Sequence, residues 1–255
     1  MFEDLAGRVA VVTGGARGLG LTMAGALARQ GVSVGLLDRL PEVAASADKL
    51  GADSGSASAG VVADVTDPGS LAAAFDQVEA QLGPATILVN SAGISVWSDA
   101  EEQSCDSWRQ VLGVNLDGTF FACQELARRC KTTGRSASIV NVSSMSGSIV
   151  NVPQHQTAYT VSKAGVTMLT KSLAVEWQQL GIRVNEIAPG YFLSDMTRQF
   201  VDDNPSLAAE WTGRTPAGRL GEPSDLEGAV VYLASDSSRY VVGHTLAIDD
   251  GYTLV

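Results

Sequence analysis

Short apolar runs alternate with stretches of helical periodicity along nearly the whole chain. The runs rich in valine and isoleucine predict strands at residues 8–13, 32–37, 59–63, 86–90, 137–143, 182–188 and 244–248. The intervening stretches predict helices at residues 19–30, 41–50, 68–82, 104–131, 157–180 and 223–235. Parallel strands need a crossover between them, usually a helix, and these helices cover the sheet. We therefore expect an α/β fold with a single doubly wound Rossmann-type parallel sheet of about seven strands and helices on both faces.

The chain shows no internal repeat and no linker long enough to separate two domains. Its 255 residues fit one domain of this type, so we predict a single domain over residues 1–255. Residues 51–60, low in complexity, predict a flexible loop before the third strand. Residues 191–222 break the alternation after a strand's carboxyl end, where open α/β sheets bind ligands, and predict a mobile substrate lid.

Composition narrows the expected partners and location. The formal net charge is −11 and no stretch is rich in lysine or arginine, which argues against nucleic acid and anionic membranes as partners. No apolar run approaches the ~18 residues of a membrane span, and the N-terminus lacks the basic and apolar regions of a signal peptide, so we expect a cytoplasmic protein.

Cysteine and histidine give little sign of further chemistry. The three cysteines include no C-x-x-C pair, and Cys123 and Cys130 lie seven residues apart on one predicted helix face, so we interpret these two as small buried apolar side chains. His155 and His244 are far apart, with no carboxylate at ligand spacing. We predict no metal site.

A glycine-rich segment, TGGARGLG at residues 13–20, joins the first predicted strand to the first predicted helix. Gly14, Gly18 and Gly20 permit a tight turn and let backbone N–H groups approach a pyrophosphate at the positive end of the helix. The spacing is only fair evidence by itself, but its position between strand and helix strengthens it. The segment predicts a dinucleotide site.

An acidic residue at the end of the second predicted strand bears on the choice of dinucleotide. Asp38 can accept hydrogen bonds from both ribose hydroxyls and would repel a 2′-phosphate. Arg17 and Arg39 argue the other way, because either guanidinium can pair with that phosphate. A buried, unpaired carboxylate facing a phosphate costs more than an exposed arginine gains. We predict NAD in preference to NADP.

Residues after the third and fourth predicted strands fit the same pocket. Asp64 can take the adenine amino group, or it can begin a helix, although Asp67 before a proline is the better cap. The segment NSAG at residues 90–93 has small side chains that leave room for a ribose.

Tyr159 and Lys163 lie one turn apart on a predicted helix. A free phenol titrates near pH 10, so it is a poor base at neutral pH. An ammonium on the same helix face, together with the charge of an oxidised nicotinamide, is expected to lower the pKa of the phenol. Tyr159 would then take an alcohol proton as hydride leaves the carbinol carbon, while Lys163 also holds the nicotinamide ribose.

Two further polar positions complete the expected chemistry. The developing carbonyl oxygen needs a second hydrogen-bond partner, and the serines at 143, 144 and 146 follow a strand shortly before Tyr159. Asn115 lies within a predicted helix, where asparagine is unfavourable, and its amide can hold a water that links Lys163 to solvent.

In their order, these motifs resemble those of the short-chain dehydrogenase/reductase family over nearly the whole chain. The resemblance implies that Ser144 is the catalytic serine and that Asn115 completes a tetrad with Tyr159 and Lys163. The gap from Ser144 to Tyr159 is longer than usual, so Ser146 remains an alternative. The family motifs also place residues at the cofactor: Gly14, Arg17, Gly18, Leu19, Gly20, Asp38, Asp64, Val65, Asn90, Ala92, Gly93, Pro189, Gly190, Phe192 and Ser194. The family commonly forms tetramers, so a homotetramer is expected.

Within this family the chain is similar to polyol dehydrogenases such as galactitol and threitol dehydrogenases. The similarity lies in ILVNSAGI at 87–94, SMSGSIVNVPQ at 144–154 and the ending DGYT. Ser146, Asn151 and Gln154 offer polar groups to a substrate with many hydroxyls, or they simply face water. We predict NAD-dependent interconversion of a secondary alcohol, a polyol, and its ketone. The alternatives are an NAD(P)H-dependent reductase of a 3-oxoacyl or steroid-type carbonyl, and a non-catalytic nucleotide-sensing protein.

Overall fold

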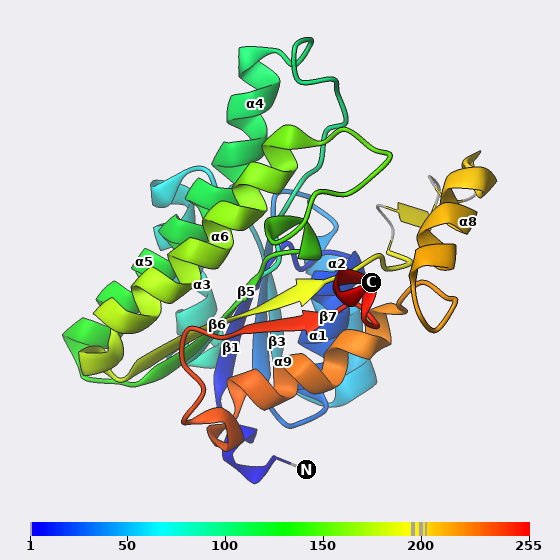
Figure 1. Cartoon of the computed structure of the whole chain (residues 1–255). Helices are drawn as coiled ribbons and strands as arrows, with labels where there is room; N and C mark the ends of the chain where they lie inside the picture. The colour runs from blue at the N-terminus through cyan, green and yellow to red at the C-terminus, as the bar shows by residue number, and fades with distance from the viewer. Residues whose placement is uncertain (1, 195–196, 199–200, 202) are drawn as a thin grey trace.

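A computed structural model describes residues 2–194, 197–198, 201 and 203–255. Seven parallel strands form one sheet in the order β3-β2-β1-β4-β5-β6-β7 (Figure 1). The strands are β1 (Val9–Thr13), β2 (Ser33–Asp38), β3 (Ser58–Val62), β4 (Ile87–Asn90), β5 (Ala137–Val142), β6 (Ile182–Pro189) and β7 (Thr245–Ile248). The fold class predicted from the sequence is confirmed.

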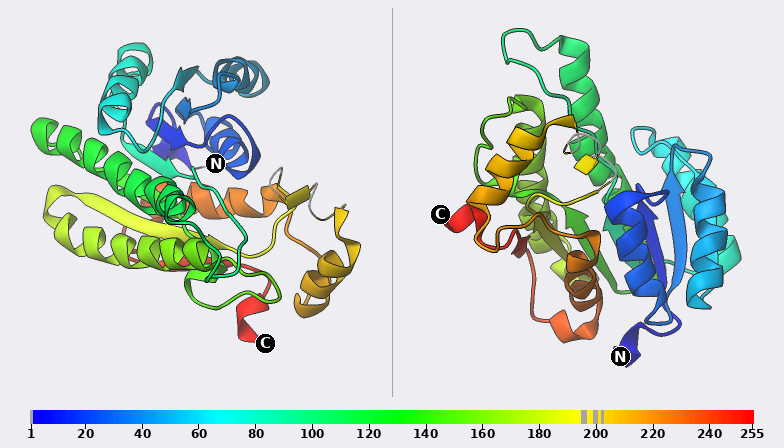
Figure 2. Two further views of the ribbon diagram at one scale, coloured as in Figure 1. Left: turned by 90° about the horizontal axis from the view of Figure 1, so that it is seen from above. Right: turned by 90° about the vertical axis from the view of Figure 1, so that its right-hand side faces the viewer.

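The sheet is covered by two layers of helices. The helices are α1 (Gly18–Ala28), α2 (Val43–Ser54), α3 (Pro68–Leu82), α4 (Cys105–Leu112), α5 (Gly118–Thr133), α6 (Thr157–Glu176), α8 (Pro205–Arg214) and α9 (Glu227–Ala234). Side chains of α1, α2 and α9 share one apolar core with Ala10 and Val12 of β1, whereas α3, α5 and α6 share a second with Val9 and Val11. Alternate strand residues thus face opposite layers of helices. Figure 2 shows these two layers on either side of the sheet.

Strand order reverses between β1 and β4. Val12 of β1 pairs with Leu36 of β2 on one side and with Val89 of β4 on the other, and β4 continues toward β5. The two halves of the sheet therefore wind away from each other at this point. In open α/β sheets the crevice at the carboxyl ends of such strands is where ligands bind.

Two predicted segments differ from the structure. Residues 104–131, predicted as one helix, form α4 and α5 joined by a π turn at Gly113–Asp117. Residues 51–60 were predicted as a loop, which is wrong for most of them, because α2 continues to Ser54 and β3 begins at Ser58. Gly55, at φ 74°, ends the helix in the left-handed conformation, and only a short turn remains. The run of alanine, serine and glycine carries almost no hydrophobic periodicity, so the sequence does not show where α2 ends or where β3 begins.

The segment predicted as a lid follows β6 and lies beyond the carboxyl ends of the strands. Its helix α8 projects from the body of the domain (Figure 1). A β-bridge between Phe192 and Gly221 brings the two ends of the segment together. Residues 195–196, 199–200 and 202 of the predicted lid lie outside the described residues, and its mobility stays a prediction.

Two remaining predictions concern the cysteines and the membrane. Cys123 and Cys130 are both buried in the core between the sheet and α5, as predicted. Burial raises the pKa of the Cys123 thiol to about 12. Among the helices of the described residues, none combines the length and apolarity that crossing a membrane requires.

Candidate active site

A groove of about 430 Å³ opens at the carboxyl ends of the central strands, where the strand order reverses. It brings together the glycine segment, the second-strand aspartate and the helix α6 tyrosine and lysine, which are far apart in sequence. Predicted residues that line the groove are Gly14, Arg17, Gly18, Leu19, Gly20, Asp38, Asp64, Val65, Ala92, Gly93, Ser144, Tyr159, Lys163, Pro189, Gly190, Phe192 and Ser194. The predicted residues absent from its lining are Asn90, Asn115, Ser146, Asn151 and Gln154.

The glycine segment forms a close-packed cradle at the start of α1. Gly14 has φ +65°, and a Cβ there would lie 2.7 Å from the backbone of Ala92. A Cβ on Gly20 would overlap the carbonyl oxygen of Gly14. Only glycine permits this approach, which leaves the N-terminus of α1 at Gly18 open to the groove. The cradle fits the pyrophosphate of a dinucleotide.

The Asp38 carboxylate is held at the edge of the groove by backbone donors. Its Oδ2 accepts a hydrogen bond from the Ala16 N–H at 3.1 Å, and its Oδ1 accepts one from the Leu40 N–H at 3.1 Å. Arg17 and Arg39 line the same groove. The negative charge that would face a ribose is therefore fixed in position, with two arginines nearby.

Asp64, which lies just after β3, and Asn90, the last residue of β4, are in different surroundings. The Asp64 carboxylate lines the groove and accepts hydrogen bonds from the N–H and hydroxyl of Thr66 at 2.8 and 2.7 Å, which lower its pKa. Asn90 is buried, and its Nδ2 contacts the Asn141 Oδ1 at 2.9 Å and the Cys123 sulfur at 3.1 Å. The Asn90 side chain therefore faces α5 rather than the groove, and the predicted place of Asn90 at the cofactor stays a prediction.

Tyr159 and Lys163 both point into the groove from α6. The Lys163 Nζ lies 5.6 Å from the centre of the Tyr159 ring and donates to the Val142 carbonyl oxygen at 2.8 Å. Burial lowers the pKa of Lys163 to about 8, and the charge of Glu186 acts in the opposite direction. With a pKa of about 8 the lysine is mainly protonated at pH 7 and loses its charge not far above it.

In the protein without a cofactor the pKa of Tyr159 is raised, whereas the predicted lowering includes the charge of a bound oxidised nicotinamide and stays a prediction. Desolvation by the surrounding protein raises this pKa, and a hydrogen bond with Ser144 only partly offsets that rise. The helix spacing puts an ammonium nearby, but the sequence does not reveal how completely the fold removes water from the phenol. Acidification of the phenol is therefore not a property of the cofactor-free protein.

The serine turn is brought to Tyr159 by a close contact with α6. A Cβ on Gly147 would lie 2.9 Å from the Lys163 carbonyl oxygen, so the turn Met145–Gly147 packs directly on the helix backbone. Ser144 lines the groove and donates to the Ser146 Oγ at 3.1 Å. The geometry favours Ser144 over Ser146 as the hydroxyl beside the phenol.

The predicted substrate residues lie together in a polar cluster behind Ser144. The Ser146 hydroxyl donates to the Asn151 Oδ1 at 2.5 Å. The hydroxyl oxygen of Tyr191 accepts hydrogen bonds from the Asn151 Nδ2 at 3.0 Å and from the Gln154 Nε2 at 2.5 Å. The Gln154 Oε1 accepts one from the Trp211 indole at 3.3 Å. These groups bind one another, and their predicted role in binding a substrate with many hydroxyls stays a prediction.

Asn115 occupies the π turn, an irregularity found frequently at functional sites. Its Oδ1 accepts from the Ile94 N–H at 2.8 Å, and its Nδ2 donates to the Ile94 carbonyl oxygen at 2.9 Å and to the Ser162 Oγ at 3.0 Å. The amide thus fixes the loop after β4, where a Cβ on Gly93 would lie 3.6 Å from the Lys163 Nζ. Its role in holding a water stays a prediction.

Several groove residues were not identified from the sequence. They include Thr66, Ile94, Val114 and Thr197. Thr66 and Ile94 each lie a few residues beyond a predicted strand end, so the topological rule would have found their segments. Val114 and Thr197 carry no comparable signal, because their places depend on the π turn and on the return of the lid segment.

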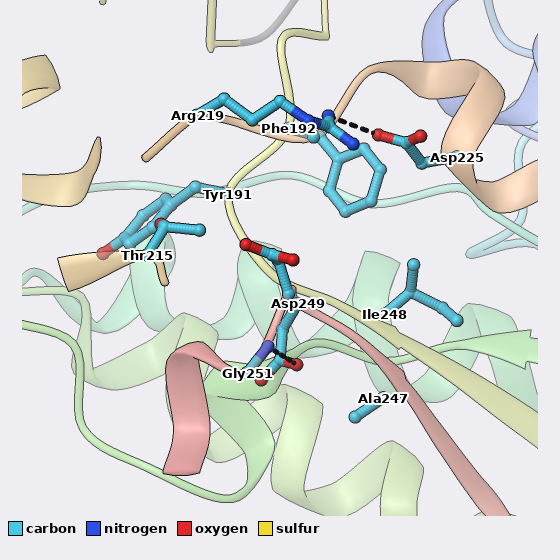
Figure 3. A pocket seen from close by; sticks show the side chains of 11 residues that line it. Tyr191, Phe192, Thr215, Arg219, Asp225, Ala247, Ile248, Asp249 and Gly251 are labelled. Carbon is cyan, nitrogen blue, oxygen red and sulfur yellow. Dashed lines mark hydrogen bonds and ion pairs between the residues drawn. The ribbon is translucent and has the colours of Figure 1, made fainter. Parts of the chain in front are cut away.

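A second pocket, of about 410 Å³, shares Phe192 with the groove and lies between the lid segment and the C-terminal turn (Figure 3). Arg219 pairs with Asp225 at 2.7 Å across its mouth. The Asp249 carboxylate accepts hydrogen bonds from the backbone of Gly251 and the hydroxyl of Thr253. These charged side chains of the second pocket therefore bind other groups of the protein. The pocket lies where the base of the lid segment meets the C-terminal turn.

Within the described residues, no group of three or more histidine, cysteine, aspartate or glutamate side chains is arranged to hold a metal ion. His155 instead forms an exposed pair with Asp99, with 2.5 Å between Nδ1 and Oδ1.

Comparison with known proteins agrees with this site. The family model described as "Enoyl-(Acyl carrier protein) reductase" matches residues 14–253. Galactitol 2-dehydrogenase (L-tagatose-forming) from Cereibacter sphaeroides is 45% identical over 98% of this chain and 96% of its own length. D-threitol dehydrogenase from Mycolicibacterium smegmatis is 40% identical over 98% and 94%. The chain therefore belongs to the short-chain dehydrogenase/reductase family of oxidoreductases.

Solved structures extend the agreement to three dimensions. A short-chain type dehydrogenase/reductase from Mycobacterium marinum has a TM-score of 0.94 at 34% identity, covering 100% of this chain and 98% of that one. A gluconate 5-dehydrogenase from Burkholderia cenocepacia, in complex with NADP and tartrate, has a TM-score of 0.92 at 36% identity, covering 100% and 99%. The two curated relatives named above are polyol dehydrogenases, and the fold is that of the family.

Proposed function

We propose that the protein interconverts a secondary alcohol of a sugar alcohol and the corresponding ketone, with NAD as the hydride carrier. The observation that carries this proposal is the meeting of Ser144, Tyr159 and Lys163 in the same groove as the glycine cradle. A nucleotide-sensing protein has no use for a phenol, an ammonium and a hydroxyl gathered at one end of its nucleotide groove. The similarity to galactitol and threitol dehydrogenases supports the substrate class.

The residues fit a dinucleotide along the whole groove. The α1 N-terminus would hold the pyrophosphate, Asp38 the adenosine ribose and Lys163 the nicotinamide ribose. When bound, the nicotinamide ring supplies the hydride acceptor or donor. The fixed carboxylate of Asp38 favours NAD, whereas Arg17 and Arg39, together with the NADP in the Burkholderia structure, are the observations that favour the phosphorylated form.

Tyr159 is the acid/base group in this proposal. Its phenol exchanges a proton with the substrate oxygen, while the Ser144 hydroxyl donates a hydrogen bond to the same oxygen as charge changes on it. The pKa of Tyr159 is raised by burial, so the phenolate forms readily only with positive charge close by. Lys163 supplies that charge from one helical turn away, and Asn115 fixes the adjoining loop.

The polyol assignment rests on the surroundings of Ser144. Behind it lie the amides of Asn151 and Gln154, and the stacked rings of Tyr191 and Trp211 lie beside them. Amide and hydroxyl groups recognise a chain of hydroxyls, and aromatic faces pack against its C–H groups. In this proposal a hydroxyl of the substrate replaces one of the hydrogen bonds that these side chains make with one another.

Assembly into a homotetramer is part of the same proposal. The exposed side of α6 carries Val161, Met168 and Val175, which are 43%, 63% and 79% exposed in the single chain. They recur every seven residues, so they form one apolar stripe along the helix.

The test measures the absorbance of the NADH or NADPH that forms when a panel of four- to six-carbon polyols is incubated with NAD or NADP. We expect turnover of at least one polyol with NAD. Consumption of NADH by a bulky ketone, with every polyol inert, would replace the proposal with a reductase of another carbonyl. Tight NAD binding without turnover of any alcohol or ketone would support a sensor.

A further inference from the structure

Glu186 is a carboxylate buried completely in the middle of β6. Three threonine hydroxyls donate hydrogen bonds to it: Thr167 to Oε1 at 2.8 Å, Thr245 to Oε1 at 2.7 Å and Thr170 to Oε2 at 3.4 Å. Neutral hydroxyls reduce the cost of burying a carboxylate but do not balance its charge. A glutamate in the interior of a central strand therefore calls for a nearby cation.

The fold brings Lys163 close enough for the charge of Glu186 to act on it. Thr167 lies four residues after Lys163 on α6, so its contact with Glu186 places the carboxylate about one helical turn, roughly 5.4 Å, along the helix from the lysine. Glu186 also pairs across the sheet with Asn141, the neighbour of Val142, whose carbonyl oxygen accepts from the Lys163 Nζ. Two independent contacts thus bring the acid and the amine to the same part of β5 and α6.

We propose that Glu186 is a positioning residue for the reaction: its buried negative charge keeps Lys163 protonated in the pH range where Tyr159 exchanges its proton. This inference rests on the proposed function, because the charge of Lys163 matters only if Tyr159 is the acid/base group. The groups that the structure records against the Lys163 amine are the phenol ring of Tyr159 on α6 and the Val142 carbonyl of β5. The Asn115 amide of the π turn and the Lys163 amine both lie beside Gly93.

The direction of the electrostatic effect follows from the burial of both groups. Burial alone lowers the pKa of Lys163 below its usual 10.5, and Glu186 raises it, with about 8 as the result. Without the carboxylate charge this pKa falls further, so at neutral pH the amine becomes partly neutral. A neutral amine no longer stabilises the phenolate, and the proton of the pair stays on Tyr159.

The direct test is the titration of Lys163 in the full chain by NMR of lysine labelled with ¹³C at Cε. The chain has four lysines, at positions 49, 131, 163 and 171, so the spectrum is simple, and Lys163→Arg identifies the signal. Glu186→Gln, which keeps the size and removes the charge, is expected to lower the Lys163 midpoint by roughly one pH unit. Thr245→Val is the matched control, because it removes one hydrogen bond to the carboxylate and leaves its charge, and it should move the midpoint far less. An unchanged midpoint in Glu186→Gln would overturn the inference.

A kinetic test separates this inference from the proposed function. In the pH profile of kcat for polyol oxidation, Glu186→Gln should shift the alkaline limb to lower pH by a similar amount and lower the plateau. A shifted Lys163 titration with no polyol turnover in the wild type would sink the proposed function and leave the electrostatic pairing intact. Loss of turnover in Tyr159→Phe combined with an unshifted alkaline limb in Glu186→Gln would support the proposed function and overturn the inference about Glu186. If the glutamine variant does not fold, Glu186→Met offers a similar volume without charge for the same measurements.

Discussion

Tyr191 stacks face to face on Trp211, with 4.2 Å between ring centres and 10° between ring planes. Tyr191 directly follows the Pro189–Gly190 end of β6, and Trp211 is the buried residue of α8. The stack therefore attaches helix α8 of the lid segment to the first residue of that segment, next to the end of β6. Because the Tyr191 hydroxyl also binds Asn151, the lid is connected through hydrogen bonds to the turn that carries Ser144.

Removing the indole should loosen this connection and weaken substrate use. Trp211→Ala deletes a large buried side chain, a change that costs about 3–5 kcal/mol when the site cannot collapse. Since α8 projects from the domain, we expect the loss to appear as a detached lid rather than as global unfolding. We predict that kcat/KM for a polyol falls by at least about tenfold. Trp211→Phe keeps the stack and should lose much less, and wild-type kinetics in Trp211→Ala would refute the coupling.

Removing the phenol of Tyr159 should abolish chemistry and spare binding. Tyr159→Phe keeps the ring and deletes the hydroxyl that exchanges the proton, so kcat should fall by roughly 10²–10⁴-fold. The NADH dissociation constant, measured by fluorescence, should change only slightly. Tyr232→Phe is the control, because it deletes a phenol hydroxyl on α9 outside the groove, and it should keep most of kcat. Retained turnover in Tyr159→Phe would remove this residue from its acid/base role.

The parts of the site that the sequence predicted are those in which spacing along one element decides the geometry. The glycine cradle and Asp38 lie at strand ends, and these ends are predicted from the points where the short apolar runs stop. Tyr159 and Lys163 share a helix face because four residues make about one turn. In each case the local pattern determines where the backbone goes, and the backbone alone places the group.

What the sequence did not reveal depends on tertiary packing. Asn90 follows the predicted strand as expected, yet its side chain turns to Cys123 and Asn141, which only the packing of α5 determines. The rise in the pKa of Tyr159 comes from exclusion of water by segments distant in sequence. The role of Glu186 was likewise not predicted, because a glutamate within a predicted buried strand gives no sign of which cation the helix packed on that strand carries.

The carboxylate of Asp38 should make the protein prefer NADH. It is held by the backbone N–H groups of Ala16 and Leu40, so it cannot swing away from a 2′-phosphate. We expect tighter binding of NADH than of NADPH in a fluorescence titration. Asp38→Asn keeps the shape, removes the charge and should shrink the preference by at least about tenfold. Asp64→Asn, at the other groove carboxylate, should change both affinities alike, and a wild-type preference for NADPH would contradict the assignment to NAD.

The apolar stripe on α6 should be the surface through which chains associate. Val166 and Leu173 of the same helix face the core, whereas Met168 and Val175 face outward and are mostly exposed in the single chain. An apolar stripe of this kind is stabilised when a second copy removes it from water, and a charge placed there would be buried without a partner. Light scattering coupled to size-exclusion chromatography should give four chain masses for the wild type and fewer for Met168→Lys/Val175→Lys. Val62→Lys is the control, because Val62 is 58% exposed at the other end of the sheet, on β3, and its replacement should leave the mass unchanged. A monomeric wild type would show that the stripe serves another purpose.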